Sequence, residues 1–450
     1  MKRILLIALT VALLTGSLVG CSRRDKYQDI LDSQYPTDTT EADTPAVMDK
    51  DTEVDGYKAT VIKKTGNTPY YKGKTVADLE ALFKTASRGT NAGTLTATGK
   101  YYNISFEDYT EQNYYYNKLT GNITEWCSDP LCELGDKCVW FWSKILYIGG
   151  EHIYFASEYD GNKWLYRSDL QRNNVEKVYD IPGNETVKVR YATDNTVFLY
   201  YMSTDTSGNT LNSLYALTIG EEVPVKISGD LNVGSNLFNS AGIYYSLVGD
   251  PERTCYRTDH AFTSSTPMWD NAKATAMTER YIIVEEYTED IMPYPSFIYD
   301  TETEKTYPLV ETKYECVIAG DYVYFERDMT EEEMADDPMR DYYTYTWTDR
   351  RKIMHGRTSR GGRIYRIKIS DLGKENAAEC VLQVTYDGVP VRIEDFEVDG
   401  DVIYISFKNH EEYKNYFNQD YDESTSNDQP HHAVADLQNG TVTFLEFEKE

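Results

Sequence analysis

Three cysteines lie close together in the chain, at Cys127, Cys132 and Cys138. Three thiolates and an imidazole can complete a tetrahedral zinc site, but the next histidine, His152, lies well beyond this segment. Outside the cytoplasm thiols can instead oxidise, and the turn at Asp129-Pro130 would bring Cys127 and Cys132 together. We therefore expect a disulfide within the triplet, with metal binding as the alternative.

Three tryptophans, Trp126, Trp140 and Trp142, flank these cysteines. Exposed indole rings can stack on sugars or hold peptides, whereas buried rings fill the space between packed strands. Packing between strands is the ordinary explanation, and contact with a ligand is the alternative.

The chain contains no recognised catalytic motif. None of its six histidines lies in a His-Glu-x-x-His arrangement, and it has no Gly-x-Ser-x-Gly elbow and no phosphate-binding glycine loop. Its carboxylates are too numerous for one pair to stand out as acid and base. The adjacent His431 and His432 are expected on the surface. The sequence thus identifies no catalytic residue and predicts no cofactor, and it favours a protein that is not an enzyme over an enzyme.

The N-terminus carries a targeting signal. Lys2 and Arg3 precede an apolar run, Ile4 to Leu14, which is shorter than the roughly 20 residues of a membrane-spanning helix. The following Leu18-Val19-Gly20-Cys21 resembles the bacterial lipobox, in which the cysteine receives a diacylglycerol and becomes the new N-terminus. We expect residues 1–20 to be a cleaved signal peptide and Cys21 to anchor the protein to the cell membrane on its extracytoplasmic side.

The composition is acidic and rich in tyrosine. The net charge of −29 repels nucleic acid and anionic lipid head groups, so membrane contact is expected only through the anchor. Tyrosine outnumbers phenylalanine by 40 to 14. Because tyrosine favours strands and keeps its hydroxyl near water, this bias predicts many half-buried strands.

Polar residues dominate 21–56, which we expect to be a flexible tether in front of a folded domain at 57–450. One helix is predicted, from Thr75 to Arg88, with Thr75 and Asp78 as a capping box and Gly89 as its end.

The rest of the domain repeats one pattern, in which a turn is followed by an aromatic and β-branched strand and then by further strands. The period is roughly 40–45 residues, which is typical of propeller blades. Repeat strands begin at Ile153, Val197, Ile243, Ile282, Val323 and Ile403. We predict an all-β chain that forms a β-propeller of about seven blades, with a β-sandwich or two smaller all-β domains as alternatives.

Two segments bear on the ring itself. A strand near Val61 is expected to close it by pairing with the last strands, around Val442 to Phe447. Residues 328–361 interrupt the repeat and are expected to form an insertion, either a decoration or a lid.

The cysteine segment also carries a family resemblance. Cys127, Asp129, Pro130, Cys132 and Cys138 match a Cys-x-Asp-Pro-x-Cys stretch with a further downstream cysteine, although Leu134 stands where that pattern has histidine. In this motif, the lipobox and the tyrosine-rich repeats, the chain resembles uncharacterised propeller-like lipoproteins of Gram-positive gut bacteria. The resemblance implies no established activity.

Two functions are consistent with these features. The first is a binding or scaffolding propeller that presents its surface to a glycan, a peptide or an envelope protein. The alternative is a carbohydrate-active hydrolase or lyase that uses carboxylates in the propeller channel. Convergent acids with shifted pKa values would favour the enzyme, and a broad aromatic surface would favour the binder.

Overall fold

The computed structural model describes residues 52–62, 88–89, 95–96, 99–105, 111–118, 121–125, 143–149, 152–159, 162–169, 174–182, 185–193, 195–204, 209–287, 293–309, 316–327, 346–349, 352–355, 362–375, 377–409 and 430–447. Within these ranges the protein is all-β, and its only helical element is the 3-10 turn η1 (Ile369–Asp371).

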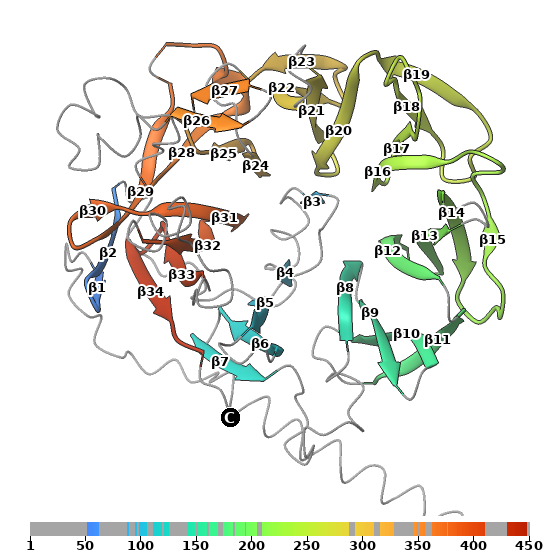
Figure 1. Cartoon of the computed structure of the whole chain (residues 1–450), viewed down its shortest axis with the longest axis horizontal. Helices are drawn as coiled ribbons and strands as arrows, with labels where there is room; N and C mark the ends of the chain where they lie inside the picture. The colour runs from blue at the N-terminus through green and yellow to red at the C-terminus, as the bar shows by residue number, and fades with distance from the viewer. Residues whose placement is uncertain are drawn as a thin grey trace, which may run out of the picture.

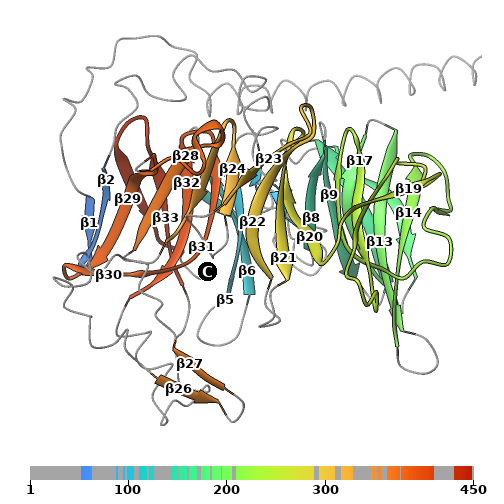
Figure 2. The same ribbon diagram turned by 90° about the horizontal axis from the view of Figure 1, so that it is seen from above.

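The strands form seven sheets of four or more strands and one two-stranded sheet. The seven larger sheets stand side by side around a ring, and the first strand of each four-stranded repeat lies on the axial side (Figures 1 and 2). The all-β propeller predicted from the repeat is thereby confirmed.

The first two sheets contain β4 (Leu95–Thr96), β5 (Gly99–Ser105), β6 (Glu111–Asn117) and β7 (Asn122–Glu125), then β8 (Ser143–Gly149), β9 (His152–Tyr159), β10 (Asn162–Asp169) and β11 (Glu176–Ile181). The next two contain β12 (Thr186–Ala192), β13 (Thr196–Thr204), β14 (Thr210–Thr218) and β15 (Val225–Lys226), then β16 (Val233–Asn239), β17 (Gly242–Leu247), β18 (Cys255–Thr258) and β19 (Ser265–Trp269).

The fifth sheet contains β20 (Ala272–Met277), β21 (Tyr281–Tyr287), β22 (Pro293–Asp300) and β23 (Lys305–Pro308). The sixth is built on β24 (Cys316–Ala319), β25 (Tyr322–Phe325), β28 (Arg363–Lys368) and β29 (Glu379–Tyr386), to which β30 (Val389–Pro390) adds. The last sheet contains β31 (Arg392–Asp399), β32 (Val402–Lys408), β33 (His431–Asp436) and β34 (Thr441–Leu445).

The repeat strands recognised in the sequence are the second strands of their sheets. Ile153, Tyr154 and Phe155 of β9 are fully buried, because neighbouring sheets cover both faces of a central strand. Each repeat therefore has one more strand on its axial side than the sequence pattern indicated.

The predicted helix is not present in the part of the chain that the structure describes. Its residues Thr75 to Ser87 lie outside that part, and Arg88 instead forms β3 (Arg88–Gly89), which pairs with the axial strand β20. The prediction of a helix ending at Arg88 is wrong, because pairing with a sheet edge satisfies this backbone instead.

The N-terminal strands join the sixth sheet rather than the last one. β1 (Thr52–Val54) pairs with β2 (Tyr57–Val61), and β2 pairs with β29 so that Val61 lies opposite Leu382. The expected pairing of Val61 with the last strands is therefore wrong. β2 still packs on the last sheet through side chains, since Tyr57 and Ala59 share a core with Val442.

Two other predicted segments are partly or wholly outside the described residues. Of the insertion at 328–361, the structure describes the hairpin of β26 (Thr346–Asp349) and β27 (Lys352–His355), which forms the separate two-stranded sheet. Ile4 to Leu14 and Cys21 lie outside. Within the described ranges, no helix is long and apolar enough to cross a membrane.

Candidate binding site

The site residues predicted from the sequence all lie outside the described part of the chain. They are Cys21, Trp126, Cys127, Cys132, Cys138, Trp140 and Trp142. The three remaining cysteines, Cys255, Cys316 and Cys380, lie in strands and form no disulfide, as expected of small apolar residues. Burial raises the pKa of Cys255 to about 12, although a backbone hydrogen bond from Ala274 opposes the shift. This thiol is therefore protonated and unreactive.

The structure instead gathers polar side chains where the last sheet faces the first one. Along the axial strand β31, Asp395, Glu397 and Asp399 alternate with Phe396 and Val398. Because side chains alternate between the two faces of a strand, the three acids form one row. Phe396 and Val398 pack in the apolar core that the last sheet shares with the sixth. The acidic row accordingly faces the first sheet. We call this row and the side chains opposite it the polar junction.

One end of the polar junction is a buried ion pair. Lys118, which follows β6, bonds Asp399, and the two side chains are 1% and 0% exposed. Burial raises the pKa of Asp399, and the attraction of Lys118 only partly offsets that shift. Its Oδ1 has no hydrogen-bond partner among the described residues. This pair is a structural link between two sheets that share no described strand pairing.

The middle of the polar junction is partly exposed to solvent. Lys100 Nζ lies 3.2 Å from Glu397 Oε2, and these side chains are 12% and 29% exposed. The same ammonium lies over the rings of Tyr102 and Tyr404, 5.2 and 5.8 Å from their centroids. Such cation–π contacts hold Lys100 in place without neutralising it.

Asp395 is the most accessible acid of the row. The residue is exposed, yet desolvation by the surrounding protein raises the pKa of its carboxyl group. Attraction by Lys100 opposes this rise in pKa, and repulsion by Glu397 adds to it. Asp395 therefore holds a proton more readily than an ordinary aspartate does.

Behind these charges lie two polar groups without partners. The hydroxyl of Tyr102, which is 5% exposed, and Nδ1 of His432 have no hydrogen-bond partner in the described part of the protein. The two rings are in edge contact, 5.1 Å apart. Burial and the charge of Glu397 raise the pKa of Tyr102 well above its usual value. His432 is half-buried, so the expectation of a surface histidine pair is wrong.

The last sheet also differs from other sheets in the charges at the start of its second strand and the end of its third strand. In four sheets the residue before the second strand accepts a backbone hydrogen bond from the residue after the third strand. In each of these sheets we compare the residue before the second strand with the last residue of the third strand. These pairs are Asn195 with Thr218, Arg280 with Asp300, Asp321 with Lys368, and Asp401 with Asp436. Three of these pairs are neutral or of opposite charge, and the last is a pair of acids.

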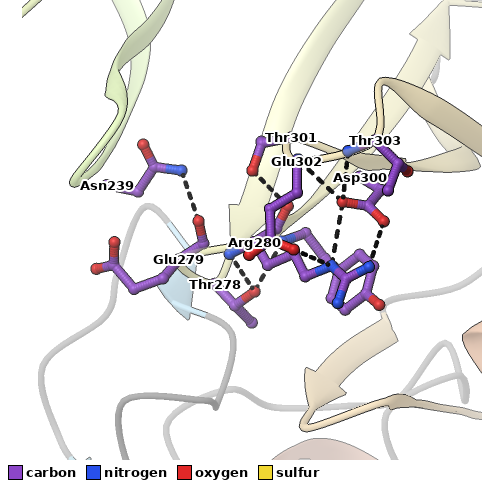
Figure 3. Close-up of polar contacts among 9 residues, drawn as sticks. Asn239, Thr278, Glu279, Arg280, Asp300, Thr301, Glu302 and Thr303 are labelled. Atoms are coloured by element: carbon purple, nitrogen blue, oxygen red, sulfur yellow. Dashed lines mark hydrogen bonds and ion pairs between the residues drawn. The ribbon is translucent and has the colours of Figure 1, made fainter.

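In the fifth sheet the two residues, Arg280 and Asp300, form an ion pair (Figure 3). Arg280 donates to both carboxylate oxygens of Asp300, from Nε at 3.1 Å and from Nη2 at 2.8 Å. Burial alone would raise the pKa of Asp300, but the bonds from Arg280 and from Thr303 lower it to about 2. The ion pair ties the start of β21 to the end of β22.

In the last sheet the same two positions repel each other. Burial raises the pKa of Asp401, Arg366 lowers it and Asp436 raises it further. Arg366 Nη1 is 3.7 Å from Asp401 and is already bound to Glu379 at 2.6 Å. Burial also raises the pKa of Asp436, against hydrogen bonds from Asn439. No group of three or more His, Cys, Asp or Glu side chains could hold a metal ion in the regions that the structure describes.

The sequence carried a weak signal for the polar junction. Acids at every second position of Asp395-Phe396-Glu397-Val398-Asp399 have the period of a strand with one charged face. Nothing in that pattern indicates Lys100 or Lys118, because they come from the other end of the chain.

No family model matches the chain, and no curated protein matches its sequence. Several solved structures are similar to it. The β-propeller domain of the trilobed protease from Pyrococcus furiosus has a TM-score of 0.45 at 10% identity over 78% of this chain and 95% of that one. An oligogalacturonate lyase in complex with manganese has a TM-score of 0.42 at 10% identity over 72% and 86%.

An acylaminoacyl peptidase from Pyrococcus horikoshii has a TM-score of 0.48 at 10% identity over 82% of this chain and 54% of that one. At such identities and scores, these likenesses are no evidence of a shared activity, and no family is assigned to the chain.

Proposed function

We propose that this protein is a lipoprotein, anchored through Cys21 outside the cell membrane, whose propeller binds a ligand or holds a partner. We further propose that each of the seven larger sheets is one blade of a closed ring. The ligand is a glycan, a peptide or another envelope protein. The observation that carries the binding role is the polar junction, where Lys100, Glu397 and Asp395 meet solvent on the axial side of rigid strands.

Two strongly buried charges elsewhere are already paired with opposite charges, which supports this assignment. Asp300 is held by Arg280, and Asp399 is held by Lys118. These pairs stabilise the sheets, and each carboxylate already faces a cation. In contrast, Asp395 is an exposed residue, and the Glu397 side chain is 29% exposed.

The anchor and the binding role are tested separately. Globomycin treatment or Cys21→Ala should release the protein from the membrane fraction, and continued lipidation of the variant would contradict the anchor. Binding is tested by calorimetry on the full chain in detergent, against neutral oligosaccharides and peptides. Failure of both ligand classes to bind would contradict the proposed function.

A hydrolase or lyase is the second candidate, and one observation favours it. Asp395 and Glu397 lie two residues apart on one strand face, and Asp395 has a raised pKa. Glycosidases use such a pair, one carboxyl group as acid and the other as base or nucleophile. Release of reducing ends from neutral oligosaccharides, lost in Asp395→Asn, would establish the enzyme in place of the binder.

A further inference from the structure

We propose that the ligand of the polar junction is a neutral, hydroxyl-rich glycan, held by Asp395, Glu397 and Lys100. This inference rests on the proposed binding function and names the ligand class for the same site. It follows from the charges of the site, from its accessibility and from the buried polar groups behind it.

The charges exclude strongly ionic ligands. Lys100 pairs with Glu397 at 3.2 Å and also attracts Asp395, so a cationic group that approached the acids would meet its ammonium. An anion would meet Asp395 and Glu397, on a protein whose net charge is −29. A neutral polar ligand avoids both repulsions.

The hydrogen-bonding capacity of the site fits hydroxyl groups. An ionised carboxylate accepts hydrogen bonds and cannot donate them, whereas an ammonium donates them and cannot accept them. A hydroxyl group does both, so neighbouring sugar hydroxyls can donate to Asp395 and Glu397 while accepting from Lys100. A peptide presents its donors and acceptors one at a time along its backbone and matches this alternation less well.

The buried Tyr102 hydroxyl next to the site indicates that the inner side of the site takes up a hydrogen-bonding ligand or water. Tyr102 is 5% exposed, and its hydroxyl has no partner in the described part of the chain although Glu397 acts on it electrostatically. Burying a polar atom without a partner is unfavourable, and such atoms commonly mark sites filled by water or ligand. A ligand hydroxyl at Glu397, or water that it orders, would give the phenol a partner.

The test is calorimetric titration of the full chain in detergent micelles with neutral oligosaccharides: maltoheptaose, cellohexaose, xylohexaose and a β-galactan hexamer. Polygalacturonate and oligolysine serve as anionic and cationic probes. We expect at least one neutral oligosaccharide to bind, and Asp395→Asn, Glu397→Gln and Lys100→Met each to weaken that binding about ten- to a hundredfold. Neither charged probe should bind at the junction.

The matched control is Glu285→Gln. Glu285 forms a comparable pair with Lys273, at 3.0 Å and with side chains 15% and 27% exposed, on the fifth sheet. This variant should bind like the natural protein, and thermal melting shows whether each variant is folded.

Each alternative outcome is distinct. Oligosaccharide binding that the three junction variants leave intact would overturn the site assignment. Peptide binding that those variants abolish, without oligosaccharide binding, would overturn the glycan class and keep the binding function. Absence of binding to every probe would overturn both proposals.

Discussion

Tyr57 and His431 are 374 positions apart in the chain and share a hydrogen bond of 2.7 Å between the phenol oxygen and Nε2. Asn409 Nδ2 donates to the same phenol oxygen at 2.7 Å. The phenol oxygen thus accepts from Asn409, and the phenol donates its proton to His431 in the tautomer whose Nε2 is unprotonated. The N-terminal hairpin, which pairs with the sixth sheet, is thus fastened to the last sheet as well.

Tyr57→Phe should lower the free energy of unfolding by about 2 kcal/mol, since it removes two hydrogen bonds in a half-buried setting. Equilibrium urea unfolding measures this change. Tyr244→Phe is the matched control, because the Tyr244 hydroxyl is buried without a partner in the described part and its loss should be neutral or stabilising. Equal effects of the two substitutions would contradict the fastening role of Tyr57.

Lys118→Met should destabilise the protein by about 3–5 kcal/mol, because it leaves Asp399 charged and buried without a cation. The double variant Lys118→Met with Asp399→Leu should recover part of the loss, since no charge is then left in the core. Lys177→Met tests an exposed pair with Asp180 and should cost less than about 1 kcal/mol. If Lys118→Met cost no more than Lys177→Met, the buried link between the first and last sheets would be refuted.

Asp401→Asn should stabilise the protein at neutral pH by about 0.5 kcal/mol, the size of a like-charge penalty between facing strand positions. The pKa of Asp401 is raised in the folded protein. Its contribution to folding stability is therefore fully present below the pKa of the unfolded chain and is lost as pH rises through the pKa of the folded protein. The advantage of the variant should therefore vanish in acid and grow towards neutrality.

Asp300→Asn provides the opposite case. Its folded pKa is lowered to about 2, so its stabilisation is present above the unfolded pKa and disappears as pH falls towards 2. Thermal melting of both variants across pH should give slopes of opposite sign. Parallel slopes would show that the pKa of Asp401 is not raised in the folded protein.

His432→Gln should flatten the pH dependence of stability between about pH 6.5 and 3. Burial, Lys100 and His431 lower the pKa of His432 to about 3, so the folded protein keeps this ring neutral while the unfolded chain takes up a proton. Stability from His432 is present above the unfolded pKa and is lost as pH falls. An unchanged difference between variant and natural protein over this range would contradict the burial of a neutral imidazole.

Thiol counting on the denatured, unreduced protein tests the predicted disulfide. Cys255, Cys316 and Cys380 form no disulfide, so a bridge within the triplet of Cys127, Cys132 and Cys138 predicts four reactive thiols in total after lipidation of Cys21. Six thiols together with bound zinc would reverse the preference for a disulfide over a metal site.

The fold class was accessible from the sequence because blades repeat locally. Runs such as Ile153-Tyr154-Phe155 are apolar on both faces, and their recurrence reports central strands packed between neighbours. The axial strands were missed because β31 alternates acids with apolar residues and reads as a polar segment. The hairpin partner was also missed, since register between Val61 and Leu382 depends on which sheet edge is free in space.

By itself, the sequence determined the signal-like N-terminus, the all-β character and the repeat, since each of these rests on neighbouring residues and short periods. Only the tertiary structure decided that Lys100 meets Glu397, that Lys118 meets Asp399, and that Asp401 faces Asp436 where Arg280 faces Asp300 in another sheet. The physical reason is that charges interact through space at a few ångströms, and ring closure brings together side chains whose separation along the chain carries no information about that distance.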